Sequence, residues 1–417
     1  MRIMSVIVWV IFSMTMGHGM ASAGDVMEKL TIDAFIATAE SDLKFLNQGE
    51  LTLDLEGAPK STPYLDRVEF RTKTEEFDVY KQKYSLRFYP KGWGETLYTK
   101  RASELESESC RAEQHDYYND AVKQRYDLAL DYLETRALIQ LTTQLTTVCE
   151  DRVHVLRKKS SGSLSFDISD LIEAEEVLTG LRLERVGLEN KMTALMHQIR
   201  LAANSQAPIA FDSVSLVRVS TIKKRIPELI PETTVNNIGL QDQKNRVDLA
   251  DNKYKLEQAK TRDYLSFVQV SYDNDEYDDL QKAYSLELAI KLPFVRSDRE
   301  EMNRRKVTYM KERLKYEEEK REISEQRTSL MRSLDRLIEQ YSILEANKNN
   351  GDADVSFKAY LNMDGVDPLN LLKIKESLIK SDIQLVKTGF DIRNRFVALL
   401  DLTGQLSQKP VKNYMAL

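Results

Sequence analysis

Two parts of this chain repeat one another at a distance of 200 residues, and this repeat constrains the fold more than any other sequence feature. Residues 76–88 (EFDVYKQKYSLRF) align without a gap on residues 276–288 (EYDDLQKAYSLEL), and the same offset aligns 166–178 on 366–378. The residues shared in this way are Glu76, Asp78, Tyr84, Ser85 and Leu86 with Glu276, Asp278, Tyr284, Ser285 and Leu286, and Asp167, Leu171, Glu176 and Leu178 with Asp367, Leu371, Glu376 and Leu378. One register for two distant segments favours a duplicated unit of about 200 residues, with chance similarity as the alternative.

The first 23 residues have the pattern of a secretory signal peptide. Arg2 provides a positive charge, residues 4–12 are apolar, and Ala21-Ser22-Ala23 places small residues before an expected cleavage at Gly24. An uncleaved membrane anchor is the alternative. No later stretch approaches the ~20 apolar residues of a membrane-spanning helix. We therefore expect an exported chain that can enter a membrane only through its strands.

The charge of the chain excludes one class of partner. The net charge is −6, and removal of residues 1–23, which hold one Arg and no acid, gives −7. Nucleic-acid binding depends on neutralising phosphates with Lys and Arg, so we expect no nucleic-acid partner. Charged residues make up 30% of the chain, with only 15 Gly and 9 Pro, a composition typical of long helices.

Two segments have the alternation of β-hairpins. In residues 66–90 apolar or Thr side chains recur at every second position from Val68, with charged residues between them. In residues 264–294 the return strand places apolar or aromatic residues at every second position from Tyr284 to Phe294. This period predicts one apolar and one polar face. Strands of about ten residues match a tilted membrane strand, although a soluble hairpin covering a helix pair has the same pattern.

A long helix is expected after each hairpin, over residues 94–158 and 297–347. The apolar residues that recur along the first are Tyr126, Leu130, Leu133, Ala137, Leu141, Leu145 and Val148. Those that recur every seven residues along the second are Met302, Tyr309, Tyr316, Ile323, Leu330, Leu337 and Leu344. An unbroken seven-residue repeat keeps one stripe of a helix against a partner helix, as in a coiled coil.

Both long helices end in turn sequences, and an Asp then precedes a returning helix. Asp167 precedes the helix expected at 168–203, and Asp367 precedes the helix expected at 368–405. Asp is a favoured N-cap because its carboxylate accepts hydrogen bonds from the first free N–H groups of a helix. Pro368 suits the first helical position.

These elements divide the mature chain into residues 24–215, residues 216–405 and a C-terminal tail, 406–417. Each of the first two units contains a preceding helix, a hairpin, a long helix and a returning helix. The preceding helix of the second unit is expected at 232–263.

Two further segments connect these elements. The preceding helix of the first unit is expected at 31–48, followed by an irregular connector at 51–67, where Gly57, Pro59 and Pro63 interrupt helical periodicity. Residues 207–231 contain three Pro and are expected to form a belt at mid-height.

Motifs of catalysis are missing from the sequence. It contains no Gly-rich phosphate loop, no HExxH and no CxxC. His115, His154 and His197 fall on expected helices, where structural roles are the simpler interpretation. We therefore expect no enzyme, no cofactor and no metal site. Cys110 and Cys149, 39 residues apart on one helix, would be separated by ~58 Å, far beyond the ~7 Å limit of a disulfide, so two buried free thiols are expected.

Acidic residues gather where the long helices reverse direction. They are Asp167, Asp170, Asp364 and Asp367. If several chains brought these tips together, the carboxylates would form rings that favour cations. Helix capping by Asp167 and Asp367 is the simpler alternative.

The order of these elements, given twice after a signal peptide, resembles that of the TolC-like outer-membrane efflux proteins. The strand and helix entry at 284–306 carries the resemblance most, supported by 84–95 and by the helix starts at 166–175 and 366–378. The resemblance spans nearly all of residues 25–405, and its specificity lies in the order and spacing of short motifs.

The resemblance implies a mainly α-helical fold with a small β part. Long coiled-coil helical hairpins would form an α-barrel tunnel, and two β-hairpins per chain would contribute to a twelve-stranded membrane β-barrel of a homotrimer. The protein would lie in the outer membrane, in contact with its lipid, with a large periplasmic part. A periplasmic adaptor and an inner-membrane transporter would dock at the helical tips.

Two sets of site residues follow from this expectation. Asp167, Asp170, Asp367 and Asn370 would fall at the constricted end of the tunnel, and Asp364 belongs to the same turn region. The candidate membrane-interface aromatics are Tyr89, Trp93, Tyr264, Tyr272 and Phe294.

The chain also departs from the family pattern. Residues 51–63 are not expected to supply the family's long helix before the first strand. The first hairpin is short and charged, and the turn at 348–365 is enlarged. The sequence thus predicts a passive export duct for efflux or type I-like secretion. The alternative is a periplasmic coiled-coil adaptor or scaffold whose strands stay in water.

Overall fold

The computed structural model describes residues 29–57, 63–74, 82–162, 168–213, 216–229, 237–261, 264–273, 283–291, 299–349, 367–409 and 412–416. The expected signal peptide at 1–23 lies outside these ranges, as do Asp167, Asp364 and Phe294.

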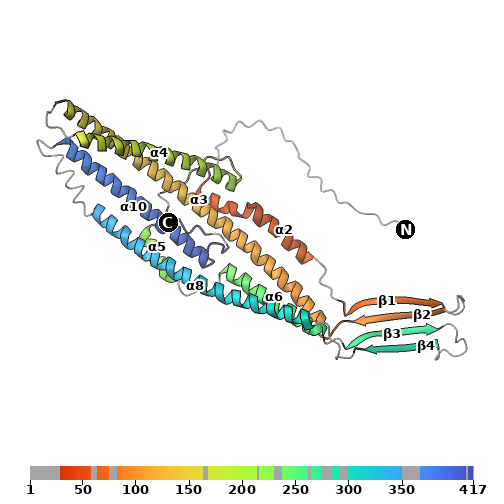
Figure 1. Cartoon of the computed structure of the whole chain (residues 1–417). Coiled ribbons are helices and arrows are strands. Elements are labelled where there is room, and N and C mark those ends of the chain that lie inside the picture. Colours follow the sequence, from red (N-terminus) through yellow and green to blue (C-terminus); the bar gives the residue numbers. More distant parts are fainter. Residues whose placement is uncertain are drawn as a thin grey trace, which may run out of the picture.

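A long helical body carries a four-stranded sheet at one end (Figure 1). Two helices, α3 (Glu95–Gly162) and α8 (Arg299–Asn349), run along this body. α3 has 68 residues, which corresponds to about 102 Å at ~1.5 Å per residue. α3 and α8 lie where the sequence predicts helices, at 94–158 and 297–347. None of the helices in the described part of the chain combines the length and apolar composition that crossing a membrane would require.

Four shorter helices pack along these two. α2 (Leu43–Gly57) and α4 (Ile168–Ala203) pack on α3, whereas α6 (Ile238–Lys260) and α10 (Pro368–Leu402) each contact both α3 and α8. α10 ends before the expected residue 405 because Gly404 adopts a left-handed conformation, with φ of 66°. The N–H of Gly404 bonds to the Asp401 carbonyl at 2.9 Å, and the N–H of Gln405 bonds to the Leu400 carbonyl at 2.9 Å, which is a Schellman termination.

The seven-residue repeat of α8 faces the rest of the body. All seven of its residues, from Met302 to Leu344, are half-buried, whereas most other positions of α8 are exposed. Leu334 and Ile338, one turn apart, are buried. α8 therefore contacts the body through one narrow stripe, as the sequence predicts.

The first helical segment differs from the prediction. The structure has α1 (Ile32–Ala37) and the 3₁₀ helix η1 (Thr38–Ser41), and then α2 continues to Gly57, so the predicted irregular connector is wrong for residues 51–57. The break comes earlier, at Asp42, whose extended backbone (φ −65°, ψ 132°) ends η1. The Asp42 carboxylate accepts a hydrogen bond from the Lys44 N–H at 3.0 Å, and the packing of α2 on α3 stabilises it as a helix despite its alternating leucines.

The main core lies at mid-height, where short segments meet the long helices. Its fully buried members include Phe35, Val122, Tyr126, Phe396 and Leu400. Part of the predicted belt at 207–231 forms α5 (Val219–Arg225) and the 3₁₀ helix η2 (Ile226–Leu229). The C-terminal tail closes this region.

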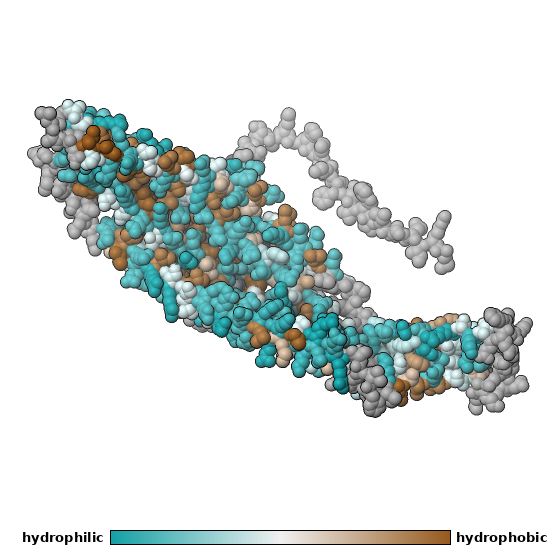
Figure 2. Space-filling view, viewed as in Figure 1, coloured by the Kyte–Doolittle hydropathy of each residue, from teal (hydrophilic) through white to brown (hydrophobic). Residues whose placement is uncertain are grey.

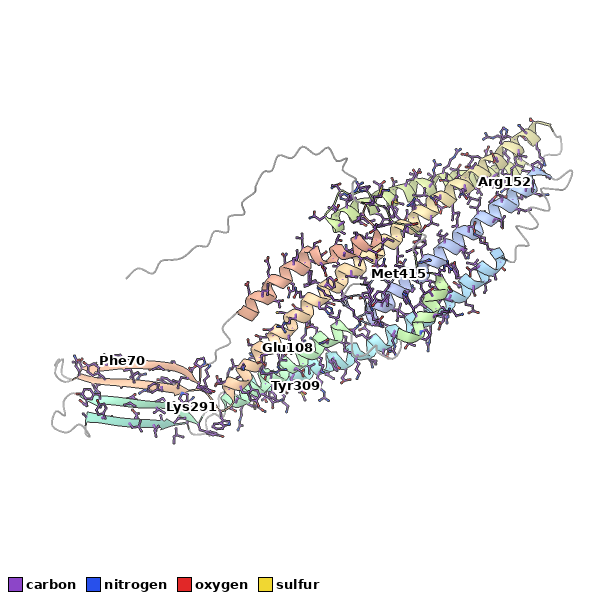
Figure 3. The ribbon with its side chains drawn as sticks, turned by 180° about the vertical axis from the view of Figure 1, so that it is seen from behind. Phe70, Glu108, Arg152, Lys291, Tyr309 and Met415 are labelled. Atoms are coloured by element: carbon purple, nitrogen blue, oxygen red, sulfur yellow. The ribbon has the colours of Figure 1, made fainter. Side chains whose placement is uncertain are left out.

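The tail contacts the belt and α3 directly. The Val217 N–H donates to the Met415 carbonyl at 2.8 Å, and the Tyr126 hydroxyl donates to the Lys412 carbonyl at 3.0 Å. Burial of the Tyr126 hydroxyl raises its pKa well above the ordinary value. Figure 3 shows Met415 at the middle of the body.

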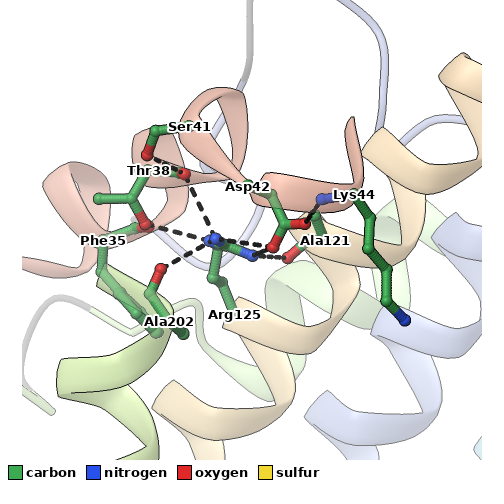
Figure 4. Close-up of polar contacts among 8 residues, drawn as sticks. All are labelled: Phe35, Thr38, Ser41, Asp42, Lys44, Ala121, Arg125 and Ala202. Atoms are coloured by element: carbon green, nitrogen blue, oxygen red, sulfur yellow. Dashed lines mark hydrogen bonds and ion pairs between the residues drawn. The ribbon is translucent and has the colours of Figure 1, made fainter. Parts of the chain in front are cut away.

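One buried guanidinium joins three segments of this core (Figure 4). Arg125 of α3 is 1% exposed. Its Nε donates to Thr38 Oγ1 at 3.0 Å, and its Nη2 donates to the Ala202 carbonyl of α4 at 3.0 Å. An ion pair of 3.3 Å joins Nη2 to Asp42 Oδ2. Arg125 therefore compensates its own burial by holding η1, the start of α2 and the end of α4 against α3.

Both cysteines lie on α3 and are free thiols, as predicted. Cys149 is buried, whereas Cys110 is only half-buried. Burial raises the pKa of both thiols, which keeps them protonated and poorly reactive.

The sheet is antiparallel throughout, in the order β1 (Leu65–Thr74), β2 (Gln82–Pro90), β3 (Leu265–Asp273) and β4 (Tyr284–Ile290). β1 and β2 form one hairpin, β3 and β4 form the other, and β2 pairs with β3. The last strand, predicted to reach Phe294, ends at Ile290, and residues 292–298 are outside the described part of the chain.

Candidate functional site

One face of the sheet is apolar and exposed. The strands pair in register, so that side chains at the same level align across all four strands. The two apolar levels are Val68, Phe88, Val268 and Leu288, and then Phe70, Leu86, Val270 and Leu286. Phe70 is 64% exposed and Leu286 is 66% exposed. Figure 2 shows hydrophobic residues reaching the surface of the sheet, and Figure 3 labels Phe70 on β1.

Three tyrosines form the next level of this face, toward the hairpin turns. Tyr84, Tyr272 and Tyr284 are register partners on β2, β3 and β4. The ring centroids of Tyr272 and Tyr284 are 5.2 Å apart. Tyr84 and Tyr284 belong to the duplicated Tyr-Ser-Leu triplets. The two triplets thus lie on β2 and β4, on either side of β3 and at the same level. An apolar band bordered by a row of tyrosines is the pattern of a membrane-facing surface.

The opposite face of the sheet is polar and charged. Arg87 lies over the ring of Phe267, 3.9 Å from its centroid, and its Nε donates to Gln269 at 2.7 Å. Arg67 lies 4.1 Å from the ring centroid of Tyr89, and the Tyr89 hydroxyl donates to Glu69 at 3.1 Å. The aromatic rings on this side are therefore covered by guanidinium groups and ion pairs, and this face suits contact with water.

The structure separates the five aromatics predicted to border a membrane. Tyr272 lies in the tyrosine level of the apolar face, whereas Tyr89 lies on the polar face. Trp93, which is 85% exposed, and Tyr264, which is 55% exposed, lie at the ends of the strands nearest the helical body. Phe294 is outside the described residues.

Sequence reasoning placed Tyr284 on an alternating apolar strand face, but it did not count Tyr84 and Tyr284 among the candidate membrane-interface aromatics. The signal was available, because the triplet that contains each of them is part of the 200-residue repeat. The sequence did not show that β3 pairs with both β2 and β4, and this pairing places Tyr272 between Tyr84 and Tyr284.

The far end of the body brings together the C-terminal end of α3 and the N-terminal end of α10. Asp367 is the N-cap of α10, and its carboxylate accepts a hydrogen bond from the Leu369 N–H at 3.2 Å. Lys159 of α3 pairs with both oxygens of the same carboxylate at 3.0 Å. The Lys159 ammonium and the Leu369 N–H lower the pKa of Asp367. Asp170 and Asn370 are exposed in the first turns of α4 and α10.

A buried ion pair stabilises the body just below this end. Arg152 of α3 contacts Glu376 of α10 at 3.2 Å, and both side chains are nearly inaccessible. Lys380 reaches the same carboxylate at 2.6 Å. Figure 3 labels Arg152 in this region. The start of α10 at the tip is thus fixed by specific contacts, whereas Asp170 and Asn370 are exposed to solvent.

The arrangement is one that solved channel structures share. No protein-family model matches the chain, and no curated protein matches its sequence. CusC, whose structures concern folding and transmembrane channel formation, matches with a TM-score of 0.64 and 11% identity over 91% of this chain and 93% of CusC. The outer membrane protein VceC of Vibrio cholerae matches with a TM-score of 0.61 and 14% identity over 89% of this chain and 96% of VceC.

A third structure is the open state of the outer membrane channel MtrE of Neisseria gonorrhoeae. Its TM-score is 0.62 at 10% identity, over 92% of this chain and 90% of MtrE. Matches that cover nine-tenths of both chains at such low identity establish a common fold, in agreement with the resemblance drawn from the sequence. The chain therefore has the fold of the TolC-like outer-membrane efflux channels.

Proposed function

We propose that the protein is the outer-membrane duct of an efflux or type I-like secretion system, a passive conduit from the periplasm to the exterior. One observation carries this proposal: a sheet with an exposed apolar face and a charged opposite face projects from the end of a helical body. Nine residues of β2 or β3 span ~30 Å, or about 23 Å when tilted by ~40°, close to the ~25 Å apolar band of membrane strands.

The open edges of the sheet support a homotrimer. β1 and β4 each have a neighbour on one side only, within the part of the chain that the structure describes. Unpaired strand edges are not tolerated in lipid, because each free N–H and C=O group there is costly. Pairing of β1 with β4 of the next chain satisfies both edges, and three chains of four strands give a closed barrel of twelve.

The far end of the body is the proposed docking site for a periplasmic adaptor and an inner-membrane transporter. Asp170 and Asn370 offer exposed polar groups there, while Asp367 fixes the start of α10. The flow through the duct would be driven by the transporter, because no catalytic group that could supply energy is assembled among the described residues of this chain.

Fractionation and reconstitution test the proposal. When the full chain is expressed with its leader, we expect the mature protein in the outer-membrane fraction. Its N-terminal residue should be Gly24. In detergent it should have the mass of a trimer by light scattering, and in planar bilayers it should give conductance steps. Recovery of a monomer from the soluble periplasm would instead support the adaptor or scaffold alternative, and the duct would have to be abandoned.

A further inference from the structure

The sheet carries an excess of positive charge, although the protein as a whole is acidic. The described residues of the two hairpins, 63–74, 82–91, 264–273 and 283–291, contain seven basic and four acidic side chains, whereas the net charge of the whole chain is −6. None of these charged residues belongs to the apolar levels or to the tyrosine level of the sheet. The bases are Arg67, Arg71, Lys73, Lys83, Arg87, Lys91 and Lys291, and the acids are Asp66, Glu69, Asp273 and Glu287.

Arg87, in the middle of the polar face, keeps its charge without a carboxylate partner. Its Nε donates to Gln269 Oε1 at 2.7 Å, and its Nη1 donates to the Tyr89 hydroxyl at 3.4 Å. The guanidinium lies 3.9 Å from the ring centroid of Phe267. No Asp or Glu in the described part of the chain pairs with Arg87, although Glu69 is its register partner on β1. Neutral groups therefore hold Arg87 in place and leave its charge uncompensated.

The carboxylate of Glu69 is already shared between two other arginines. Its Oε1 contacts Arg67 Nε at 3.0 Å, and its Oε2 contacts Arg71 Nη2 at 2.5 Å. One acid thus serves two guanidiniums, and one positive charge remains from this group. The two arginines are half exposed or more, so their charges act on the solvent beside this face.

Two lysines face each other at the end of the first hairpin nearest its turn. Lys73 and Lys83 are direct register partners on β1 and β2, and like charges in this position cost stability. Asp273 on β3 offsets part of this cost, since its Oδ2 lies 3.4 Å from Lys83 Nζ. The positive charge therefore extends along the strands and is not confined to Arg87.

The end of the sheet nearest the helical body repeats one arrangement in both hairpins. The Lys91 N–H donates to the Tyr64 carbonyl at 3.0 Å, and the Lys291 N–H donates to the Tyr264 carbonyl at 2.9 Å. Both tyrosines and both lysines are 200 positions apart, and the register of each hairpin shifts just after its tyrosine. Figure 3 labels Lys291 where the sheet meets the body. The duplication thus places one lysine per hairpin at this junction.

In the proposed duct, on which this assignment rests, the uncharged face of the sheet contacts lipid and the charged face lines the lumen. Three chains would bring nine excess positive charges to one barrel. Twelve strands ~4.8 Å apart and tilted by ~40° close at a radius of about 12 Å. The whole lumen then lies within about one Debye length of the charged side chains, ~10 Å at 0.1 M salt. We propose that the barrel selects anionic solutes, and that the cargo of the duct carries net negative charge.

Reversal potentials in planar bilayers test this selectivity, with KCl as the probe because K⁺ and Cl⁻ have nearly equal mobility in water. Under a gradient around ~0.1 M we expect the parent trimer to prefer Cl⁻ by about threefold or more, and the preference should weaken toward ~1 M as screening increases. Arg87→Gln/Lys91→Gln removes six of the nine excess charges of the trimer and should bring the permeability ratio close to one. Arg87→Lys/Lys91→Arg preserves the charges and should retain the preference.

The matched control is Lys223→Gln/Lys224→Gln, which removes as many charges from exposed positions of α5, at mid-height and away from the sheet. Its permeability ratio should equal that of the parent. Conducting trimers that prefer K⁺, or an equal shift in the control, would overturn anion selectivity while the duct remains. The sign of the parent's preference decides this even if a variant fails to insert. A parent protein that never conducts would instead overturn the duct, and the selectivity with it.

Discussion

The helical body buries its large apolar side chains, whereas the sheet leaves side chains of the same kinds exposed. In the body, Phe35, Phe396 and Leu400 are wholly buried by other parts of the chain. In the sheet, Phe70, Leu288 and Ile290 remain more than half exposed, although they are no less apolar. The body is therefore stabilised by its own packing, whereas one apolar face of the sheet is left uncovered by the described part of the chain.

The largest effect is expected in the core of the body. Phe396→Ala removes a fully buried ring from the mid-height cluster, and the lost transfer energy and the new cavity should cost about 3–5 kcal/mol. The midpoint of urea unfolding, followed by helical circular dichroism in detergent, measures this cost. Leu288→Ala, at a position 57% exposed, should change it by less than about 0.5 kcal/mol. Equal losses of unfolding free energy in Phe396→Ala and Leu288→Ala would contradict this difference between the body and the sheet.

A similar loss is expected when the buried guanidinium is removed. Arg125→Ala leaves Asp42, Thr38 and the Ala202 carbonyl without their donor, so we expect a loss of about 3–5 kcal/mol. The same unfolding measurement applies. Arg157→Ala is the control, because Arg157 pairs with Glu175 on the surface, where such pairs contribute about 0–1 kcal/mol. A small effect at Arg125 would show that the η1–α2 corner does not depend on it.

A charge added to the sheet should impair membrane insertion on the apolar face and not on the polar face. Leu286→Arg places a cation on the apolar face, where the proposed lipid contact predicts a cost of about 2–4 kcal/mol near the membrane midplane. Ser285→Arg, on the neighbouring residue of the same strand, points to the polar face and should be tolerated. The fraction of protein that floats with outer-membrane vesicles distinguishes the two. If both variants insert equally well, the apolar face does not contact lipid.

The smallest effect is expected at the exposed tip. Asp367→Ala removes an N-cap, worth about 1 kcal/mol, and an ion pair with Lys159. Because contacts lower the folded-state pKa of Asp367, its contribution is fully present above the unfolded pKa of about 3.9. It is lost as pH falls through the still lower folded pKa. The difference between parent and variant in urea unfolding should therefore become smaller as the pH falls below about 3.9.

A companion variant separates the two parts of this contribution. Asp367→Asn keeps a capping oxygen but removes the charge, so it should retain most of the stability with little pH dependence in this range. A parent-to-Ala difference that persists unchanged at pH 3 would show that the ion pair with Lys159 and the ionised cap do not contribute.

Local chemistry made many elements predictable. The half-buried stripe from Met302 to Leu344 follows from the seven-residue period alone, and the start of α10 follows from Asp367 and Pro368. The end of α10 was predicted too far along, because the left-handed conformation of Gly404 depends on how the tail turns back to the core. The helix at 51–57 was missed since its leucines alternate like those of a strand, and only packing on α3 makes it helical.

The candidate sites divide in the same way. The alternation around Phe70 and Leu286 predicted a two-faced hairpin in each half of the chain. The same alternation places Tyr89 on the face opposite Leu86 and Phe88, where the structure has it. That Tyr272 lies level with Tyr84 and Tyr284 was not readable, because it depends on the pairing of β2 with β3 and of β3 with β4. The acidic pocket lined by Asp116, Glu322 and Asp401 at mid-height could not be foreseen, since these residues are far apart in sequence and meet only where α6 begins and α10 ends.

The sequence by itself determined the kind and order of the elements: two hairpins of alternating residues, two long helices with apolar seams, and the helix starts marked by Asp. These depend on interactions between residues a few positions apart, which the chain carries wherever it folds. Only the tertiary structure decided the pairing of β2 with β3, the extension of α2 and the meeting of acids at mid-height. Each of these depends on contacts between distant segments, whose free energy exists only once those segments are brought together.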